Sequence, residues 1–503
     1  MTSQKWELQE KDKPCRITPN YNSHPMHRRS HTFLILFCLA ALGAGCAENS
    51  PTLEKPNIVI VVADDMGWGD VGYHGSPIST PAIDRLAQEG MVLDRFYVLP
   101  VCSPTRAGLM TGRYPIRFGL MKAAIPPHRN FSMDEEELIM PQVLANAGYE
   151  HRGIFGKWHL GHTHIKYTPT RRGFTEFVGH YNGAIDYFSH ERDGELDWHR
   201  NEESNYDEGY TTDLIADAAS NFIRKHANDG PFFCYVPFNA PHSPFQAQDE
   251  AIDRYRSLPE LPANTTNNQF RPTYAAMVDS MDQGISRILQ AIEEAGIADN
   301  TLVWFFSDNG GTSYAGDNRP LRGSKGDVFE GGTRVPSVVR WPAKVPAGTK
   351  SEARMAVVDV LPTLIEISGV TPPLGKPLDG ISAFDILTGK HTQADRDVFN
   401  YIGSRGEEHE QISLASGSWK LVVQGPNIIN QNLNDSNRRK FLFRIDQDPN
   451  ETMDLAHEFP ERVSSMYQRL VEFRSLQPPN AIAPYVEPTP GFKAPQEWRV
   501  PGN

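Results

Sequence analysis

The sequence predicts an α/β fold, a doubly wound and mostly parallel sheet with helices on both faces, followed by a small C-terminal α+β domain with an antiparallel sheet. Three observations support this prediction. Continuous apolar runs rich in β-branched residues, such as 57–63 and 301–306, are typical of strands buried on both faces. Segments with helical periodicity alternate with such runs, which indicates parallel βαβ units. After residue 397 short alternating segments replace them, as in an antiparallel sheet.

The individual elements follow from these patterns. Thr80, Pro81 and Gly90, for example, mark the cap, the first residue and the end of a helix. In the large domain we predict strands over 57–63, 92–98, 149–155, 232–238, 301–306 and 335–340. The predicted helices span 80–90, 139–147, 213–226, 272–295 and 355–367. In the C-terminal domain we predict strands over 412–415, 419–423 and 440–444, and a helix over 461–476.

Four regions are predicted along the chain. Residues 1–50 form a targeting segment, 55–390 a catalytic domain, 391–480 the α+β domain, and 481–503 a proline-rich, extended tail. A chain of 503 residues is long enough for a large domain with ample core and a smaller one. Its net charge of −13 argues against a nucleic-acid-binding protein, which normally carries a basic surface.

The N-terminal region has the features of an export signal. Arg28 and Arg29 precede an apolar run over 33–42, which is too short to span a membrane comfortably. Gly-Ala-Gly-Cys46 follows and resembles a bacterial lipoprotein cleavage box, with Cys46 as the lipidated residue. Simple secretion and a start at Met26 remain alternatives. The expected location is therefore the periplasm or the bacterial cell surface, with membrane contact only through a lipid anchor.

Few cysteines remain once that segment is removed. Besides Cys46 there are only Cys102 and Cys234, so an exported protein of this sequence has no disulfide framework. Cys234 lies in the apolar run 231–238, which predicts a buried structural residue. Cys102 has a different setting.

The stretch 100–113 surrounds Cys102 with groups that favour an anion. Ser103 is a good N-cap and Pro104 suits the first helical position, so Cys102 would precede a helix N-terminus with unpaired N–H groups. Arg106 adds a permanently charged, planar group suited to a tetrahedral oxyanion. A buried structural cysteine beside a surface arginine is the alternative interpretation.

Oxygen-bearing side chains follow two of the predicted strands. Asp64 and Asp65 come directly after 57–63, and Asp308 and Asn309 come after the run that starts at Thr301. Ligands bind at the carboxyl ends of strands in open α/β sheets, where these side chains would meet. Three carboxylates and an amide favour calcium or magnesium over zinc. Taken singly, such residues are more often turn or helix caps.

Cationic and protonatable groups follow other predicted strands. The set that we expect at the same sheet edge comprises Arg106, Lys157, His159, His242 and Lys325. On a chain of net charge −13, this concentration predicts an anionic substrate whose developing charge these groups stabilise.

The residues around Cys102 also resemble a known signature. Cys-Ser-Pro-Thr-Arg at 102–106, followed by Leu-Met-Thr-Gly-Arg, is similar to the motif of type I sulfatases of the alkaline-phosphatase superfamily, in which the cysteine is oxidised to formylglycine (3-oxoalanine). A cysteine-phosphatase loop is excluded because its arginine would stand where Gly108 lies. Further similar motifs lie at 57–69, 156–161, 240–242, 307–310, 321–326 and 330–336.

The resemblance implies a calcium-dependent sulfuric ester hydrolase, with magnesium the less favoured ion. The metal ligands that it implies are Asp64, Asp65, the modified Cys102, Asp308 and Asn309. The hydrated aldehyde at position 102 would attack sulfur, with help from Asp308, and form a covalent sulfo-enzyme.

The remaining site residues receive roles from the same resemblance. His242 and Lys325 would protonate or neutralise the leaving oxygen. His159 would take the proton of the remaining hydroxyl, so that sulfate is eliminated and the aldehyde returns. Arg106 and Lys157 would hold position 102 and the sulfate.

The substrate class is suggested by a further stretch. Residues 186–191 resemble the corresponding segment of arylsulfatase B, or N-acetylgalactosamine-4-sulfatase-like, bacterial carbohydrate sulfatases, which implies a sulfated polysaccharide or oligosaccharide substrate. A formylglycine-generating or anaerobic maturation enzyme is the implied partner. Two alternatives remain: a phosphate or phosphonate ester hydrolase of the same superfamily, and a non-catalytic glycan-binding lipoprotein in which Cys102 stays a thiol.

Overall fold

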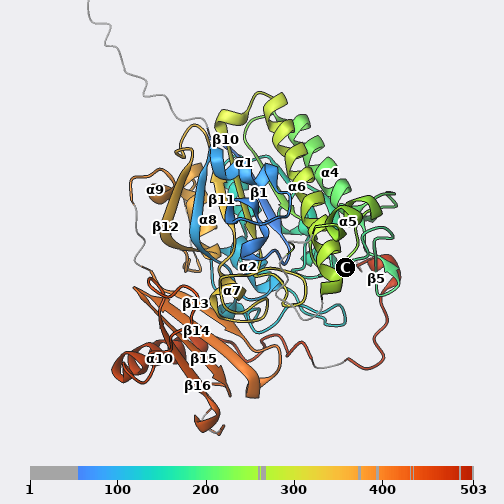
Figure 1. The fold of residues 1–503 in the computed structure, drawn as a ribbon. Helices are drawn as coiled ribbons and strands as arrows, with labels where there is room; N and C mark the ends of the chain where they lie inside the picture. Colours follow the sequence, from blue (N-terminus) through green and yellow to red (C-terminus); the bar gives the residue numbers. More distant parts are fainter. Residues whose placement is uncertain are drawn as a thin grey trace, which may run out of the picture. The chain divides into compact units, whose positions relative to one another are not determined.

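The fold is that of a computed structural model (Figure 1). It describes residues 55–500 except 259–260, 262–267, 372–374, 392–395, 431, 434 and 487–488, and these residues belong to one compact unit. The predicted targeting segment 1–50, with Cys46, lies outside the described residues. Within the described part of the chain, no helix is long and apolar enough to cross a membrane.

A ten-stranded sheet forms the centre of the fold. Its order is β12 (Thr349–Ala356), β2 (Met91–Tyr97), β11 (Ser337–Arg340), β10 (Thr301–Ser307), β1 (Asn57–Ala63), β9 (Phe232–Pro237), β3 (His151–Lys157), β4 (Glu176–His180), β7 (His199–Arg200) and β8 (Glu203–Ser204). From β12 to β4 only β11 runs against the others. The carboxyl ends of β1, β2, β3, β9 and β10 therefore lie at one edge, and the predicted mostly parallel sheet is confirmed.

Helices cover both faces of this sheet, as predicted (Figure 1). In β1, Ile58, Ile60 and Val62 pack in one apolar cluster while Val59 and Val61 pack in another, as the alternation of a strand requires. Helices α2 (Cys102–Thr111), α3 (Met140–Asn146) and α8 (Val360–Ser368) share the first cluster. Helices α1 (Pro81–Glu89), α4 (Thr211–His226), α5 (Asp249–Arg256) and α6 (Arg271–Glu294) share the second.

A smaller antiparallel sheet follows in the C-terminal part. It contains β13 (Val398–Ile402), β14 (Glu410–Ser416), β15 (Trp419–Gly425) and β16 (Arg439–Arg444), and α10 (Pro460–Arg474) packs against it. An apolar cluster including Phe329 and Phe443 joins this sheet to the loops of the large one. The short elements α7 (Glu330–Thr333), α9 (Phe384–Leu387), β5 (Glu191–Arg192) and β6 (Glu195–Leu196) lie in connecting segments.

Some predicted elements have different bounds. The helix predicted over 355–367 begins only at Val360, since Met355 belongs to edge strand β12. β3 starts two residues later than predicted, because the Tyr149 N–H donates to the Leu144 carbonyl in the turn that follows α3 and so takes no part in the sheet. The short strands β4, β7, β8 and β13 lie where no element was predicted, and β12 forms mostly from residues for which no element was predicted.

The C-terminal tail makes specific contacts with the rest of the fold. Ile482 is buried and its N–H donates to the Gly119 carbonyl. Trp498 is 1% exposed and its indole N–H donates to the Arg192 carbonyl at 2.8 Å. The tail therefore packs back onto the loops at the carboxyl edge of the large sheet.

Candidate active site

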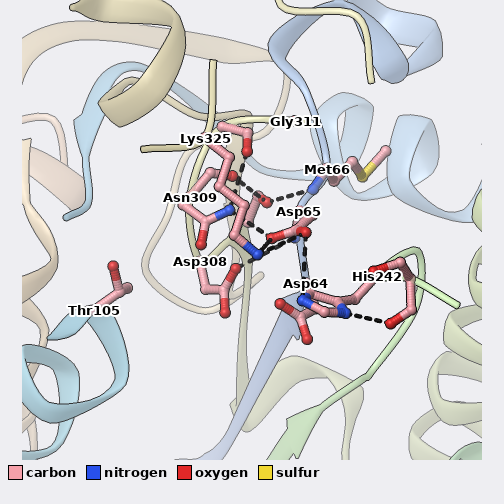
Figure 2. A network of polar contacts seen from close by, with 12 residues as sticks. Asp64, Asp65, Met66, Thr105, His242, Asp308, Asn309, Gly311 and Lys325 are labelled. Atoms are coloured by element: carbon pink, nitrogen blue, oxygen red, sulfur yellow. Dashed lines mark hydrogen bonds and ion pairs between the residues drawn. The ribbon is translucent and has the colours of Figure 1, made fainter. Parts of the chain in front are cut away.

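Two neighbouring strands carry the oxygen-bearing side chains to one place. Asp64 and Asp65 follow β1, Asp308 and Asn309 follow β10, and the two strands pair in parallel along their length. All four side chains are buried, and the Asp65 N–H donates to Asp308 Oδ1 at 3.3 Å (Figure 2). Asp65 has a φ of +71°, a strained conformation of the kind that clusters at functional sites.

Cys102 is the first residue of α2 and belongs to this cluster. The predicted cap is wrong: the helix starts before Ser103, and Ser103 Oγ instead accepts a hydrogen bond from the Ile125 N–H at 3.1 Å. Ligand atoms of Cys102, Asp64 and Asp308 all lie within 4.8 Å of one another. Burial raises the pKa of the Cys102 thiol, so the thiolate is disfavoured in this setting.

Arg106 and Lys157 are paired with two of these carboxylates. The Arg106 guanidinium donates two hydrogen bonds to Asp308 Oδ2, at 3.0 and 2.8 Å, and one to the Lys157 carbonyl. Lys157 Nζ donates to Asp64 Oδ2 at 2.6 Å. Both cations are buried and both fix the orientation of an acidic side chain.

Lys325 and His242 approach Asp65 from two other loops (Figure 2). Lys325 Nζ lies 2.7 Å from Asp65 Oδ1, and His242 Nε2 lies 3.7 Å from Asp65 Oδ2. Burial opposes the charge of Lys325, but Asp65 outweighs it, so the pKa of Lys325 lies above its ordinary value. Burial and the Lys325 charge lower the pKa of His242 to about 3.

His159 follows β3 and is held with one ring nitrogen free. Its Nε2 lies 2.8 Å from the Ile125 carbonyl and must donate there, whereas its buried Nδ1 has no partner among the described residues. Burial and the Lys157 charge hold the pKa of His159 well below its ordinary value. A Cβ at Gly183 would lie 2.4 Å from the His159 ring, so glycine is needed at that position.

The donor set fits a hard cation. Within the described residues, Asp64 Oδ1 and Asn309 Oδ1 are buried without a hydrogen-bond partner, an arrangement that a metal ion would satisfy. Burial and the neighbouring Asp64 charge raise the pKa of Asp308 to about 6, so this carboxylate lacks full compensation from the nearby cations. Only oxygen atoms are offered by these three residues, which favours calcium or magnesium.

A pocket of about 300 Å³ opens above this cluster. From the predicted set, Cys102, His159, His242 and Lys325 line the pocket. Arg106 and Lys157 are not among its lining residues, and their side chains contact Asp308 and Asp64 in this structure. Unpredicted lining residues include Arg192, Ser404, Arg405, Tyr485 and Val486. Arg192 comes from the short strand β5 and the others come from a loop and from the tail, where no sequence motif marked them.

Comparisons with known proteins agree with this geometry. The family model described as "Sulfatase" matches residues 56–370, well over half of the chain. The chain belongs to the sulfatase family. The family hydrolyses sulfate esters of carbohydrates, so the protein is a sulfuric ester hydrolase. A second model, "N-sulphoglucosamine sulphohydrolase, C-terminal", matches residues 324–475 of this sulfatase.

Named relatives cover most of this sulfatase. It is 32% identical over 463 residues to human N-acetylgalactosamine-6-sulfatase, covering 83% of this chain and 85% of the relative. It is 31% identical to mouse arylsulfatase J, covering 88% of this chain and 79% of the relative. The solved structure of Ps i-CgsB in complex with k-i-k-neocarrahexaose superposes with a TM-score of 0.75 at 30% identity, covering 85% of this chain and 95% of that chain.

Proposed function

We propose that this sulfatase is an exported, calcium-dependent enzyme that removes sulfate from a sulfated polysaccharide or oligosaccharide through a formylglycine made from Cys102. One observation carries the proposal: Cys102 lies in the pocket wall and also within 4.8 Å of ligand atoms of Asp64 and Asp308. A position that faces both substrate and metal is where a nucleophile is needed.

The surroundings of Cys102 favour its conversion over its use as a thiol. Its pKa is raised by burial, and the carboxylates beside it oppose a second negative charge. A formylglycine at this position would supply, once hydrated, a hydroxyl nucleophile and a later release of sulfate by C–O cleavage. The partner of this modification is a maturation enzyme of the host, either formylglycine-generating or anaerobic.

Calcium is the metal that we propose for Asp64, Asp65, Asp308 and Asn309. The support is the all-oxygen donor set and the unpaired Asp64 Oδ1 and Asn309 Oδ1. When bound, the ion would neutralise the carboxylates and polarise oxygen atoms of the reacting group.

The residues on the pocket wall have different roles in the proposed reaction. His159 stays neutral and keeps a free lone pair on Nδ1, which is the state of a proton acceptor. Lys325 stays charged and stabilises the leaving oxygen. His242 lies beside it, with Nδ1 2.5 Å from the Ser243 carbonyl, and supports the same oxygen.

The proposed substrate and location rest on the sequence and the relatives together. One relative is named N-acetylgalactosamine-6-sulfatase, and the structure of Ps i-CgsB was solved in complex with k-i-k-neocarrahexaose, so both names point to a carbohydrate substrate. The 186–191 stretch resembles 4-sulfatase-like enzymes and a named relative is a 6-sulfatase, so both sulfate positions are candidates. The apolar run before Cys46 supports export, with lipidation of Cys46 as the proposed anchor.

Two measurements test the proposal. Mass spectrometry of the peptide spanning Cys102, from protein made in its native host, should find formylglycine; a persistent thiol would overturn it. Turnover of aryl sulfate should then exceed turnover of the matching aryl phosphate. A strong phosphate preference would favour the alternative function, a phosphate or phosphonate ester hydrolase. The phosphonate monoester hydrolase of Agrobacterium radiobacter has a fold similar to that of this chain (TM-score 0.60, 19% identity).

A further inference from the structure

We propose that Arg192 and Arg405 form a second anion site in the pocket, so that the substrate carries another negative group beside the sulfate that is removed. The inference rests on the proposed function, because it assumes that a sulfated glycan occupies the pocket above Cys102. It adds a specificity: a sugar unit with a second sulfate or a carboxylate nearby is bound better than one with a single sulfate.

The first step is the position of the two arginines. Both line the pocket of about 300 Å³ that also contains Cys102, His159 and Lys325. This volume lies at the lower end for ligand sites and suits a sugar unit with its substituents. A group bound at Cys102 therefore brings its neighbouring substituents to these two side chains.

The second step is that neither guanidinium donates a hydrogen bond to a described residue. In the described part of the chain, Arg405 is exposed and makes no hydrogen bond or ion pair. Arg192 Nε is buried without a hydrogen-bond partner among the described residues, and it makes a long ion pair of 3.6 Å with Asp193 Oδ2. Lys325, by contrast, is paired with Asp65. The two arginines are thus the cations of the pocket wall that remain available to a ligand.

The third step is that the loops carrying them are fixed by the tail. Trp498 donates to the Arg192 carbonyl, and the Glu497 N–H donates to Glu195 Oε2 at 3.0 Å on the same hairpin. The Val486 N–H donates to the Ser404 carbonyl, next to Arg405. The tail therefore connects both arginine-bearing loops, and it adds the half-exposed ring of Tyr485 to the same pocket.

The chemistry then selects the ligand. A guanidinium presents a planar fork that matches the oxygen atoms of sulfate or carboxylate. A neutral sugar filling the pocket would take both charges out of water without a partner, which costs free energy. On a protein of net charge −13, two arginines beside a sulfate site whose guanidinium groups donate no hydrogen bond to a described residue favour a ligand with more than one anionic group.

Binding to the full-length Cys102→Ala protein tests the site without turnover. Isothermal titration would compare two matched pairs: carrageenan disaccharides with one or two sulfates, and a monosulfated chondroitin disaccharide with its carboxyl-reduced form. We expect the more anionic member of at least one pair to bind about tenfold more tightly, the scale of one charge-assisted hydrogen bond. The pair that responds distinguishes a second sulfate from a carboxylate.

Arg192→Gln and Arg405→Gln, each in the Cys102→Ala protein, should then remove this preference. Arg224→Gln is the matched control, because Arg224 pairs with Glu294 on exposed helix surface and should leave the preference unchanged. The inference is overturned if the parent protein distinguishes neither pair, or if the preference survives both substitutions. Absence of aryl sulfate turnover in the unsubstituted enzyme would instead contradict the proposed function. Failure of the second anion site and failure of the proposed function are therefore distinguishable.

Discussion

Two buried groups of charges in this sulfatase have similar chemistry and different surroundings. The catalytic cluster consists of Asp64, Asp65, Asp308, Arg106, Lys157 and Lys325. The junction cluster consists of Glu330, Glu451, Lys420 and Arg334, where the small sheet meets the loops of the large one. Both combine carboxylates with cations at ion-pair distance and little exposure to water.

The two clusters differ in where their carboxylate oxygen atoms without a hydrogen-bond partner lie. In the junction cluster Lys420 Nζ lies 2.8 Å from Glu330 and 2.9 Å from Glu451, and Tyr97 donates a further hydrogen bond to Glu330. None of these residues lines the pocket above Cys102. Each cluster has a buried carboxylate oxygen without a hydrogen-bond partner among the described residues, Asp64 Oδ1 in the catalytic cluster and Glu451 Oε1 in the junction cluster. Glu451 Oε1, however, lies 2.9 Å from the Lys420 ammonium group, whereas Asp64 belongs to the cluster beneath the pocket. Buried ion pairs alone therefore do not mark a functional site; unpaired oxygen atoms beside a pocket do.

The largest expected effect separates two buried cysteines. Cys102→Ala should lower aryl sulfate turnover roughly 10⁴-fold or more, because the nucleophile position is lost, while the free energy of unfolding changes by about 1 kcal/mol. Cys234→Ala is the matched control: Cys234 is buried in β9 and should lose about 1–2 kcal/mol of stability but keep its activity. Retained activity in the Cys102 variant would show that the nucleophile is elsewhere.

Next in size is the cost of breaking the junction cluster. Lys420→Met removes the cation shared by Glu330 and Glu451 and leaves two buried carboxylates facing each other. We expect a loss of about 3–5 kcal/mol in the free energy of unfolding, measured by urea denaturation. Lys225→Met removes an exposed pair with Glu176 and should cost at most about 1 kcal/mol. Equal effects of the two substitutions would contradict a structural role for the junction cluster.

The third prediction uses the metal to distinguish the clusters. Calcium at 100 times its Kd should raise the free energy of unfolding of chelator-treated protein by about 2.7 kcal/mol. Asp308→Asn should reduce this increment, because it removes one of the proposed ligands. Glu330→Gln, in the junction cluster, should keep the increment although it lowers the stability of the protein. If the calcium-dependent increase survived Asp308→Asn and was lost in Glu330→Gln, the ion would bind in the junction cluster, which would contradict the proposed metal site.

The same comparison shows what sequence can predict. The strand ends carrying Asp64 and Asp308 were predictable because β-branched runs fix buried strands, and parallel strands bring their carboxyl ends together. Arg405 and Tyr485 were not, because they enter the pocket from a loop and a tail whose composition is ordinary. The edge strand β12 alternates lysine, glutamate and arginine with small residues, so its burial depends on neighbours that the local pattern does not contain.

The smallest expected effect concerns pH. Burial and the Lys157 charge hold the pKa of His159 well below its ordinary value, so its Nδ1 stays unprotonated when the solution is acidified. An unperturbed histidine with a pKa near 6.5 would lose about tenfold of its basic form between pH 7.5 and 5.5. A proton acceptor with a lowered pKa keeps its basic form over this interval, so the sign of the shift predicts that activity persists on the acid side.

With calcium saturating, kcat should therefore change less than about twofold over that interval. The control is Lys157→Met, which removes one of the charges that lower the pKa of His159 and also removes the ion-pair partner of Asp64. As the solution is acidified, the remaining activity of this variant should begin to fall at a higher pH than the activity of the unsubstituted enzyme. A tenfold fall in the unsubstituted enzyme centred near pH 6.5 would mean that the acceptor is exposed to water during the reaction. The catalytic cluster, which lies at a pocket while the junction cluster does not, would then be more accessible to water than its burial in this structure indicates.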